Sequence, residues 1–264
     1  MAISEIDVPT KVDSLPGLSH SEALRLAESQ MSALENELRR LDPDDWDAPT
    51  DCDRWSVHDI VAHIVGWAES MTSPKAFLQQ AKLTRTLRKE LNDKLDAQNE
   101  AQVVARRDMS PEELIEAWSV ASPKFLAVRR RVGRIAKPIP IFIPAIGLTH
   151  ARFLLAQIFM RDHFMHRIDI SRATKKEMTL GEPERRIVAD VVRHWGRNSK
   201  ADATLDLSGE AGGVFKAGTG ERVTIKGDAL DFCRLMSGRA DISSFTLEGD
   251  EGAGRAWLAV TVPF

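Results

Sequence analysis

The chain has 264 residues, of which 43% are hydrophobic and 28% are charged, so it is long enough for one large domain or two smaller ones. Its 36 basic and 39 acidic side chains give a formal charge of -3, which offers no electrostatic basis for binding nucleic acid. No stretch approaches the ~20 apolar residues of a membrane span, and the N-terminal residues lack the pattern of a secretory signal. Two cysteines, Cys52 and Cys233, are too few for a disulfide scaffold. We therefore expect a cytoplasmic protein that binds small molecules or proteins.

Helical patterns occupy the chain up to about residue 197. Residues 1–19 mix polar and apolar side chains with proline and glycine, and we expect them to form no core element. From Ser21 to Leu41 the apolar positions follow a 3.6-residue period, which predicts an amphipathic helix. Ser56 and Asp59 resemble a capping box and predict the start of a second helix. Further helices are expected over residues 78–104, 111–132 and 183–197, and another that Thr149 caps and that runs to about Ala173. A proline-rich segment at 137–148 cannot be regular helix.

After Asn198 the pattern changes to short alternating segments separated by glycines. These predict strands over residues 203–207, 214–217, 222–226 and 245–247, and a helix over 228–236. The tail from Gly249 to Phe264 is compatible with helix or strand. We therefore predict an α+β protein with an N-terminal extension over residues 1–20, a helical domain over 21–197 and a small α+β domain over 198–264.

Three residues in the helical part could share one metal ion. Asp162 and His166 are four residues apart on a predicted helix, so both side chains can reach the same point. His63 lies on the apolar face of another predicted helix, where a bare imidazole needs a polar partner. Three such ligands leave a position open for water or substrate, as catalytic sites do. Nitrogen and carboxylate ligands suit a zinc-like divalent ion, with nickel, iron and manganese as alternatives.

Each of these residues also has a simpler interpretation. A single histidine on an apolar face is usually a hydrogen-bonded core residue. The Asp162–His166 pair is also typical of an ion pair within one helix. Spacing alone does not decide between the two interpretations.

Two motifs resemble those of a known family. The string from Asp51 to His63 (Cys-x-x-Trp-Ser-Val-x-Asp-Ile-Val-x-His after Asp51) is similar to the N-terminal domain of the mycothiol-dependent maleylpyruvate isomerases, which belong to the DinB-like four-helix-bundle metalloproteins. Residues 162–174 resemble the second motif of that family, an acidic residue, three residues, His, and then Arg-x-Asp-Ile. After residue 200, Gly227-Asp228 and Ser237-Gly-Arg239 resemble its small, sterol-carrier-like C-terminal domain.

The resemblance implies a divalent metal, usually zinc, held by His63, Asp162 and His166. The metal would act on a low-molecular-weight thiol such as mycothiol, or on a substrate carbonyl. An arginine of the C-terminal domain would reach the site and pair with a substrate carboxylate, and Arg239 matches it best. The implied reaction is isomerisation or S-transfer on a small electrophilic, acidic substrate. The implied assembly is a monomer or a homodimer.

The sequence departs from the isomerase at Asp162, because the isomerase has Glu there, one methylene longer. Asp169 is interpreted as orienting His166 or as pairing with Arg172. His163 points about 100° away from Asp162 around the helix, so we expect it not to be a ligand. Cys52 is interpreted as a small packed residue, with a catalytic thiol as the alternative. The following basic side chains are interpreted as a solvated helix end, with anion binding as the alternative: Arg129, Arg130, Arg131 and Arg134.

Three classes of function therefore stay open, and the last of them is a purely structural or regulatory protein, which an undisturbed Asp162–His166 ion pair would favour. In the first, the protein is a metal- and thiol-dependent isomerase or transferase. In the second, the same fold has lost its metal and binds a small molecule without catalysis.

Overall fold

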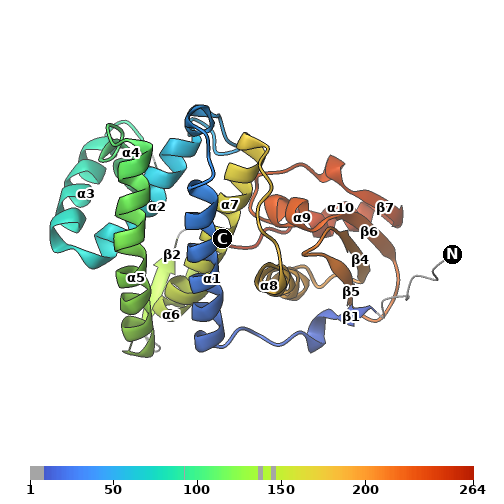
Figure 1. The fold of residues 1–264 in the computed structure, drawn as a ribbon. Coiled ribbons are helices and arrows are strands. Elements are labelled where there is room, and N and C mark those ends of the chain that lie inside the picture. Colours follow the sequence, from blue (N-terminus) through green and yellow to red (C-terminus); the bar gives the residue numbers. More distant parts are fainter. Residues whose placement is uncertain (1–8, 92, 136–138, 144–146) are drawn as a thin grey trace. The chain divides into compact units, whose positions relative to one another are not determined.

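The computed structural model describes residues 9–91, 93–135, 139–143 and 147–264, which form two compact units (Figure 1). The helical unit comprises Ala23–Ile143 and Gly147–Thr179. The sheet unit comprises Leu180–Phe264 together with the residues up to Glu22. The prediction of an α+β protein is confirmed, because one unit is mainly helical and the other contains a mixed sheet. Among the described residues, no helix is long and apolar enough to cross a membrane.

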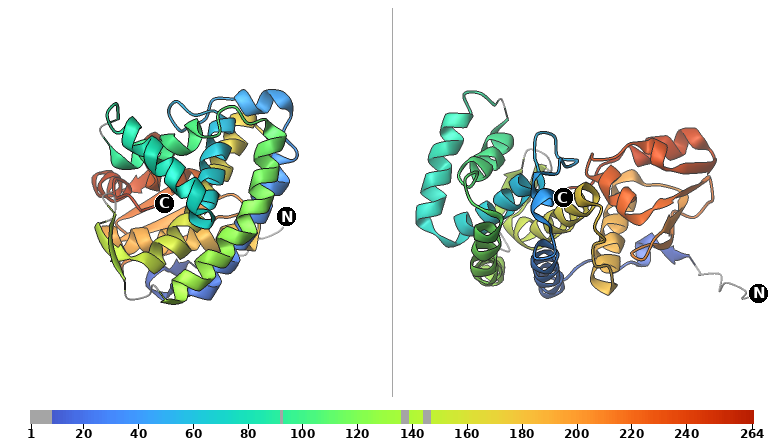
Figure 2. Two further views of the ribbon diagram at one scale, coloured as in Figure 1. Left: turned by 90° about the vertical axis from the view of Figure 1, so that its left-hand side faces the viewer. Right: turned by 45° about the horizontal axis from the view of Figure 1, so that its top comes forward.

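The helical unit is built around α2 (Val57–Thr72), which contacts its neighbours on several sides. Because of these contacts, most of the α2 side chains are buried, including Ile60, Val61 and Ile64. The other helices of the unit are α1 (His20–Leu38), α3 (Pro74–Leu87), α4 (Lys94–Val104), α5 (Pro111–Ile135), α6 (Ala151–Phe153) and α7 (Phe159–Thr174). The antiparallel helices α3 and α4 lie side by side (Figures 1 and 2).

The start of α2 confirms the expected capping box. The Ser56 Oγ atom accepts a hydrogen bond from the Asp59 backbone N–H at 3.3 Å, and the Asp59 carboxylate accepts one from the Ser56 backbone N–H at 3.1 Å. These bonds satisfy two backbone donors that the first turn of a helix leaves free. They also fix the first residue of the helix that carries His63.

Two of the predicted helices are wrong in their extent. The helix expected over 78–104 is two helices, because Asp93 caps α4 by accepting hydrogen bonds from the backbone of Leu95 at 2.7 Å and Asp96 at 3.0 Å. Thr149 does not cap the next helix, because it pairs with Ile141 in a hairpin of β2 (Pro140–Ile143) and β3 (Gly147–His150), and His150 instead precedes the first helical residue, Ala151. The segment predicted to be non-helical thus contains strands, and its residues 137–138 and 144–146 lie outside the described part.

A π-helical segment, Leu154–Ile158, leads into α7. The buried guanidinium of Arg129 donates hydrogen bonds to the carbonyl oxygens of Leu155 and Ala156, the latter at 3.2 Å. The interpretation of Arg129 as a solvated helix end is therefore wrong. Its side chain instead satisfies carbonyl groups in an irregular turn directly before the helix that carries Asp162 and His166.

The sheet unit contains five strands in the order β1-β5-β4-β6-β7. The central strands β4 (Ala203–Ser208) and β6 (Val223–Asp228) are parallel, and β5 (Gly213–Ala217) and β7 (Thr246–Gly249) pair antiparallel on either side. Three helices complete the unit, and they are α8 (Glu182–Ser199), α9 (Ala229–Met236) and α10 (Glu251–Leu258). The tail that was compatible with either type of structure is therefore helical over α10.

Residues near the N-terminus join this sheet. Thr10–Lys11 form β1 and pair parallel with β5, and the following Val12 is buried. The expectation that residues 1–19 form no core element is therefore wrong for this segment. Gly196 of α8 allows the close approach, since a Cβ atom there would lie 2.6 Å from the Val12 Cγ1 atom.

Candidate metal centre

Helices α2 and α7 bring His63, Asp162 and His166 together. One ligand atom from each residue lies within 4.8 Å of the other two. Asp162 and His166 are one turn apart on α7, with the Asp162 Oδ1 atom 3.4 Å from the His166 Nε2 atom. The rings of His63 and His166 lie nearly perpendicular, with their centroids 5.3 Å apart. The structure thus places these three residues of the predicted metal site in one cluster.

His63 occupies the apolar face of α2 and is 3% exposed. Its Nδ1 atom is buried and makes no hydrogen bond of standard geometry, although the Gln102 amide lies close enough to act on the pKa of the ring. Burial lowers the pKa of His63 to about 3, so its imidazole is neutral at neutral pH. A neutral, buried imidazole with an unsatisfied nitrogen is costly unless a ligand satisfies it.

The ring of His166 is held by the carboxylate of Asp169, which lies one turn further along α7. The His166 Nδ1 atom is 3.0 Å from the Asp169 Oδ2 atom, and both residues are buried. The sequence allows two interpretations of Asp169, and the structure shows its carboxylate in contact with His166. The Arg172 Nε atom donates to Asp51 at 3.0 Å. Proteins commonly hold a metal-binding histidine by such a carboxylate.

The protonation of the cluster follows from its charges. Burial opposes a charge on His166, but the nearby carboxylates, Asp162 above all, raise its pKa well above the usual value. Burial likewise opposes ionisation of Asp162, but His166 lowers the pKa of that carboxyl well below its ordinary range. A positive charge between these residues is therefore favoured, and a divalent cation would supply it in place of the proton.

The donor set fits a divalent metal. Two imidazoles and one carboxylate are typical ligands of catalytic zinc, and three protein ligands leave one position open. Neighbouring ligand atoms on a tetrahedral zinc lie roughly 3.4 Å apart, which matches the Asp162–His166 distance of 3.4 Å. The His63 imidazole offers one ring nitrogen to this set.

His163 lies outside this donor set. Its Nδ1 atom hydrogen bonds to the carbonyl oxygen of Phe159, and its ring packs against Trp118 with the centroids 5.5 Å apart. Burial lowers its pKa to about 4. The side chain thus fills the core on another face of α7.

Cys52 is a neighbour of the site, and its contact there was not predicted from the sequence. Its Sγ atom donates to the Asp169 Oδ2 atom at 3.5 Å, so it contacts the carboxylate that holds His166. Cys52 precedes the capping box of α2 and lies 117 residues from Asp169. The cysteine was visible within the first motif, but nothing in the sequence indicated this contact.

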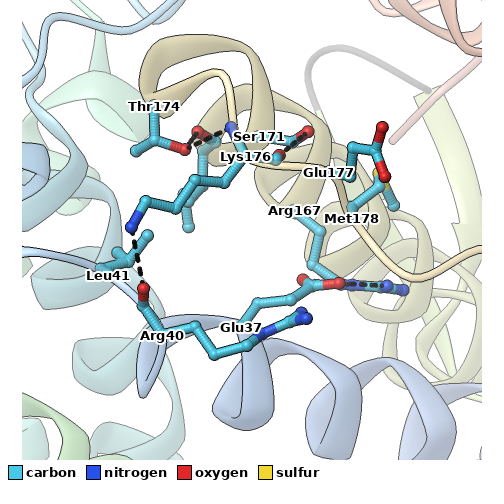
Figure 3. Close-up of a pocket in the computed structure, with 10 residues that line it drawn as sticks. Glu37, Arg40, Leu41, Arg167, Ser171, Thr174, Lys176, Glu177 and Met178 are labelled. Atoms are coloured by element: carbon cyan, nitrogen blue, oxygen red, sulfur yellow. Dashed lines mark hydrogen bonds and ion pairs between the residues drawn. The ribbon is translucent and has the colours of Figure 1, made fainter.

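A buried ion pair holds α7 on the opposite side from the cluster. Arg167 follows His166 in the chain and donates to both carboxylate oxygens of Glu37 in α1, at 2.7 and 2.9 Å. It also donates to the Thr179 carbonyl oxygen at 2.6 Å. These two charged residues form part of the wall of a cavity of about 300 Å³ between the end of α1 and the end of α7 (Figure 3). The ion pair fixes the rotation of α7 and thus the direction in which His166 points.

Arg239 lies in the sheet unit, shortly after α9. Gly238 adopts a left-handed conformation with φ of 81°, and the Arg239 backbone N–H donates to the Arg234 carbonyl oxygen at 2.8 Å. This turn fixes the backbone that presents the partly buried Arg239 side chain. The role of Arg239 toward a substrate stays a prediction.

A match to a protein-family model shows which family the chain belongs to. The model for the mycothiol maleylpyruvate isomerase N-terminal domain matches residues 27–171, more than half of the chain. The match includes His63, Asp162 and His166. The chain belongs to this family.

Solved structures agree with this family in fold. The chain is similar to two crystal structures of a mycothiol-dependent maleylpyruvate isomerase, one of them a mutant with alanine in place of a histidine, with TM-scores of 0.57 and 0.56. Each is 16% identical in sequence, and each comparison covers 90% of this chain and 95% of the other. At this identity the likeness establishes the shared α+β fold. Among curated proteins, none matches the sequence.

Proposed function

We propose that this member of the family is a metal-dependent enzyme that uses a low-molecular-weight thiol of the mycothiol type. Its reaction would be isomerisation of, or S-transfer to, a small electrophilic substrate that carries a carboxylate. The observation that carries this proposal is the cluster of His63, Asp162 and His166, whose ligand atoms lie within 4.8 Å of one another. The membership in the family supports the same reaction class.

Each of the three residues would offer the metal an atom in a suitable protonation state. His63 offers a neutral nitrogen because burial keeps it unprotonated. Asp162 offers an ionised oxygen, and although it is one methylene shorter than Glu it reaches within 3.4 Å of the His166 Nε2 atom. Asp169 accepts from the His166 Nδ1 atom and thereby leaves the Nε2 lone pair for the metal. A bound zinc ion would lower the pKa of a coordinated thiol and polarise a carbonyl group.

Arg239 is the proposed partner of the substrate carboxylate. Its guanidinium can donate two parallel hydrogen bonds to a carboxylate, which orients as well as binds the substrate. Lysine at this position would keep the charge but lose the paired geometry. We therefore expect Arg239→Lys to raise KM and Arg239→Ala to raise it further.

The direct test is an assay of zinc-loaded protein with maleylpyruvate and mycothiol. We expect turnover that requires both the thiol and the metal, and we expect its loss in His166→Ala. His150→Ala is the matched control, because His150 is exposed and lies outside the cluster. Turnover that continues without thiol, or that is equal in His166→Ala and wild type, would overturn the proposal.

A second candidate is a small-molecule-binding module that has lost its metal. The contact between Asp162 and His166 favours it, because an ion pair within α7 satisfies both groups without a metal. Elemental analysis after dialysis separates the two candidates. An open three-ligand site retains about one equivalent of metal, whereas the binding module retains none and takes up none.

A further inference from the structure

A second candidate site lies on the helical unit, along α3. A cavity of about 770 Å³ is formed by residues of α2, α3 and α4, and it contains none of the proposed metal ligands. We call it the α3 groove. Its volume is within the range of pockets that hold small organic ligands, roughly 300–1,000 Å³.

The wall of the α3 groove includes large apolar side chains. Trp67 and Met71 come from α2, and Phe77 comes from the first turn of α3. Phe77 is 58% exposed, although a phenylalanine gains free energy when it is removed from water. An apolar molecule in the groove would cover this ring.

The other end of the α3 groove is cationic. Arg85, Arg88, Lys89 and Lys94 line it, and none of the described lining residues is acidic. None of these four side chains has an ion pair or a hydrogen bond with a described residue. Four like charges around one cavity repel each other, and an anion between them would relieve that repulsion.

Helix stability explains only part of this group of charges. Cations near the end of α3 are favourable toward the helix dipole, and Arg85 and Arg88 fit that rule. Lys94 does not, because it is the first residue of α4, where a positive charge is unfavourable. An anion in the groove would make its position favourable.

We propose that the α3 groove binds a small amphipathic anion. The apolar part of this ligand packs against Trp67, Met71 and Phe77, and its single anionic head group contacts Arg85, Arg88 and the two lysines. The arginines can hold the head group by paired hydrogen bonds. None of the proposed metal ligands lines this groove, and the proposal does not rest on the proposed function.

Calorimetric titration with dodecanoate, kept below its micelle concentration, tests the site. We expect saturable binding of about one equivalent and no saturable binding of dodecyltrimethylammonium, which has the same chain and the opposite charge. The double variant Arg85→Gln/Arg88→Gln should weaken dodecanoate binding at least about tenfold, because hydrogen bonds to a charged group are lost. Both side chains are exposed, so the variant should fold.

Two further variants separate the groove from general surface effects. Ala81→Trp fills the groove from an exposed position of α3 and should abolish binding. Lys82→Gln removes an exposed charge of α3 that does not line the groove, and it should leave binding unchanged. Absence of saturable binding, equal affinity for both detergents, or equal weakening in Lys82→Gln would overturn the proposal. Binding to vesicles of phosphatidylglycerol without binding of free dodecanoate would overturn it in favour of a membrane surface.

Discussion

The Oδ2 atom of Asp169 lies 3.0 Å from the Nδ1 atom of His166, inside the core of the helical unit. This bond orients the imidazole so that its other nitrogen, Nε2, faces Asp162 at 3.4 Å. A carboxylate that accepts from one imidazole nitrogen makes the other a better metal ligand. We therefore expect Asp169 to affect the affinity of the site for a metal through His166.

Removing the negative charge of Asp169 should weaken the metal site. We expect Asp169→Asn to lower zinc affinity about 10- to 100-fold, because the neutral amide holds the ring less firmly. The measurement is a competition titration with a chromophoric chelator. A zinc affinity equal to that of the wild type would contradict this role of Asp169. Circular dichroism of the variant serves as the folding control.

The stability of the metal-free protein should depend on His163. Burial lowers the folded-state pKa of His163 to about 4, below its ordinary value of 6.5. The unfolded chain thus binds more protons between these values, so the stabilisation is complete above pH 6.5 and is lost as the pH falls toward 4. On acidification, His163→Phe should therefore lose less of its free energy of unfolding than the wild type, by up to about 3 kcal/mol. Urea unfolding of the chelator-treated proteins at several pH values measures this difference. Equal pH dependence in both proteins would contradict the shift.

Glu37 of the amphipathic helix α1 should contribute more to the free energy of unfolding than a glutamate on a helix surface does. It is the carboxylate partner of the buried Arg167 (Figure 3). Glu37→Gln leaves that guanidinium uncompensated and should lower the free energy of unfolding by about 3–5 kcal/mol. Glu28→Gln is the control, because it breaks an exposed pair with Arg130 and should have little effect. Similar urea midpoints for the two variants would be inconsistent with a buried pair.

Gly66 allows the close approach of α2 and α4 near the metal centre. A Cβ atom at this position would lie 2.5 Å from the Gln102 Cβ atom, which is too close to the backbone to move away. Gln102 is fully buried, and its amide lies beside His63. We expect Gly66→Ala to destabilise the protein by about 1–3 kcal/mol. Gly252→Ala in α10, where the nearest atom is 3.6 Å away, should not be destabilising in the same thermal unfolding assay.

Local signals in the sequence predicted much of the fold. The Ser56–Asp59 capping box and the helical period of α1 are visible in a few neighbouring residues, and both are confirmed. The errors arise where tertiary contacts decide. Asp93 ends one helical pattern and starts another, and Thr149 pairs with Ile141 in a hairpin that helical periodicity cannot indicate. Burial of Arg129 depends on the carbonyl groups of a π-helical segment, which has no sequence signature.

The candidate site was predictable to the extent that it lies within single helices. The spacing of Asp162, His166 and Asp169 fixes their common face of α7. The distance from His63 to this face depends on how α2 packs against α7, and the contact of Cys52 depends on a loop. Only the resemblance to a family connected these segments in advance.

The metal content of the purified protein tests the central claim most directly. Elemental analysis is made on wild type, His63→Ala and the exposed control His150→Ala, all prepared without a metal-affinity tag or chelator and checked for folding by circular dichroism. We predict about one equivalent of zinc or another divalent metal in wild type and His150→Ala, and its loss in folded His63→Ala. Wild-type protein that contains no metal and takes up none, or equal metal in all three proteins, would contradict the assignment of His63, Asp162 and His166.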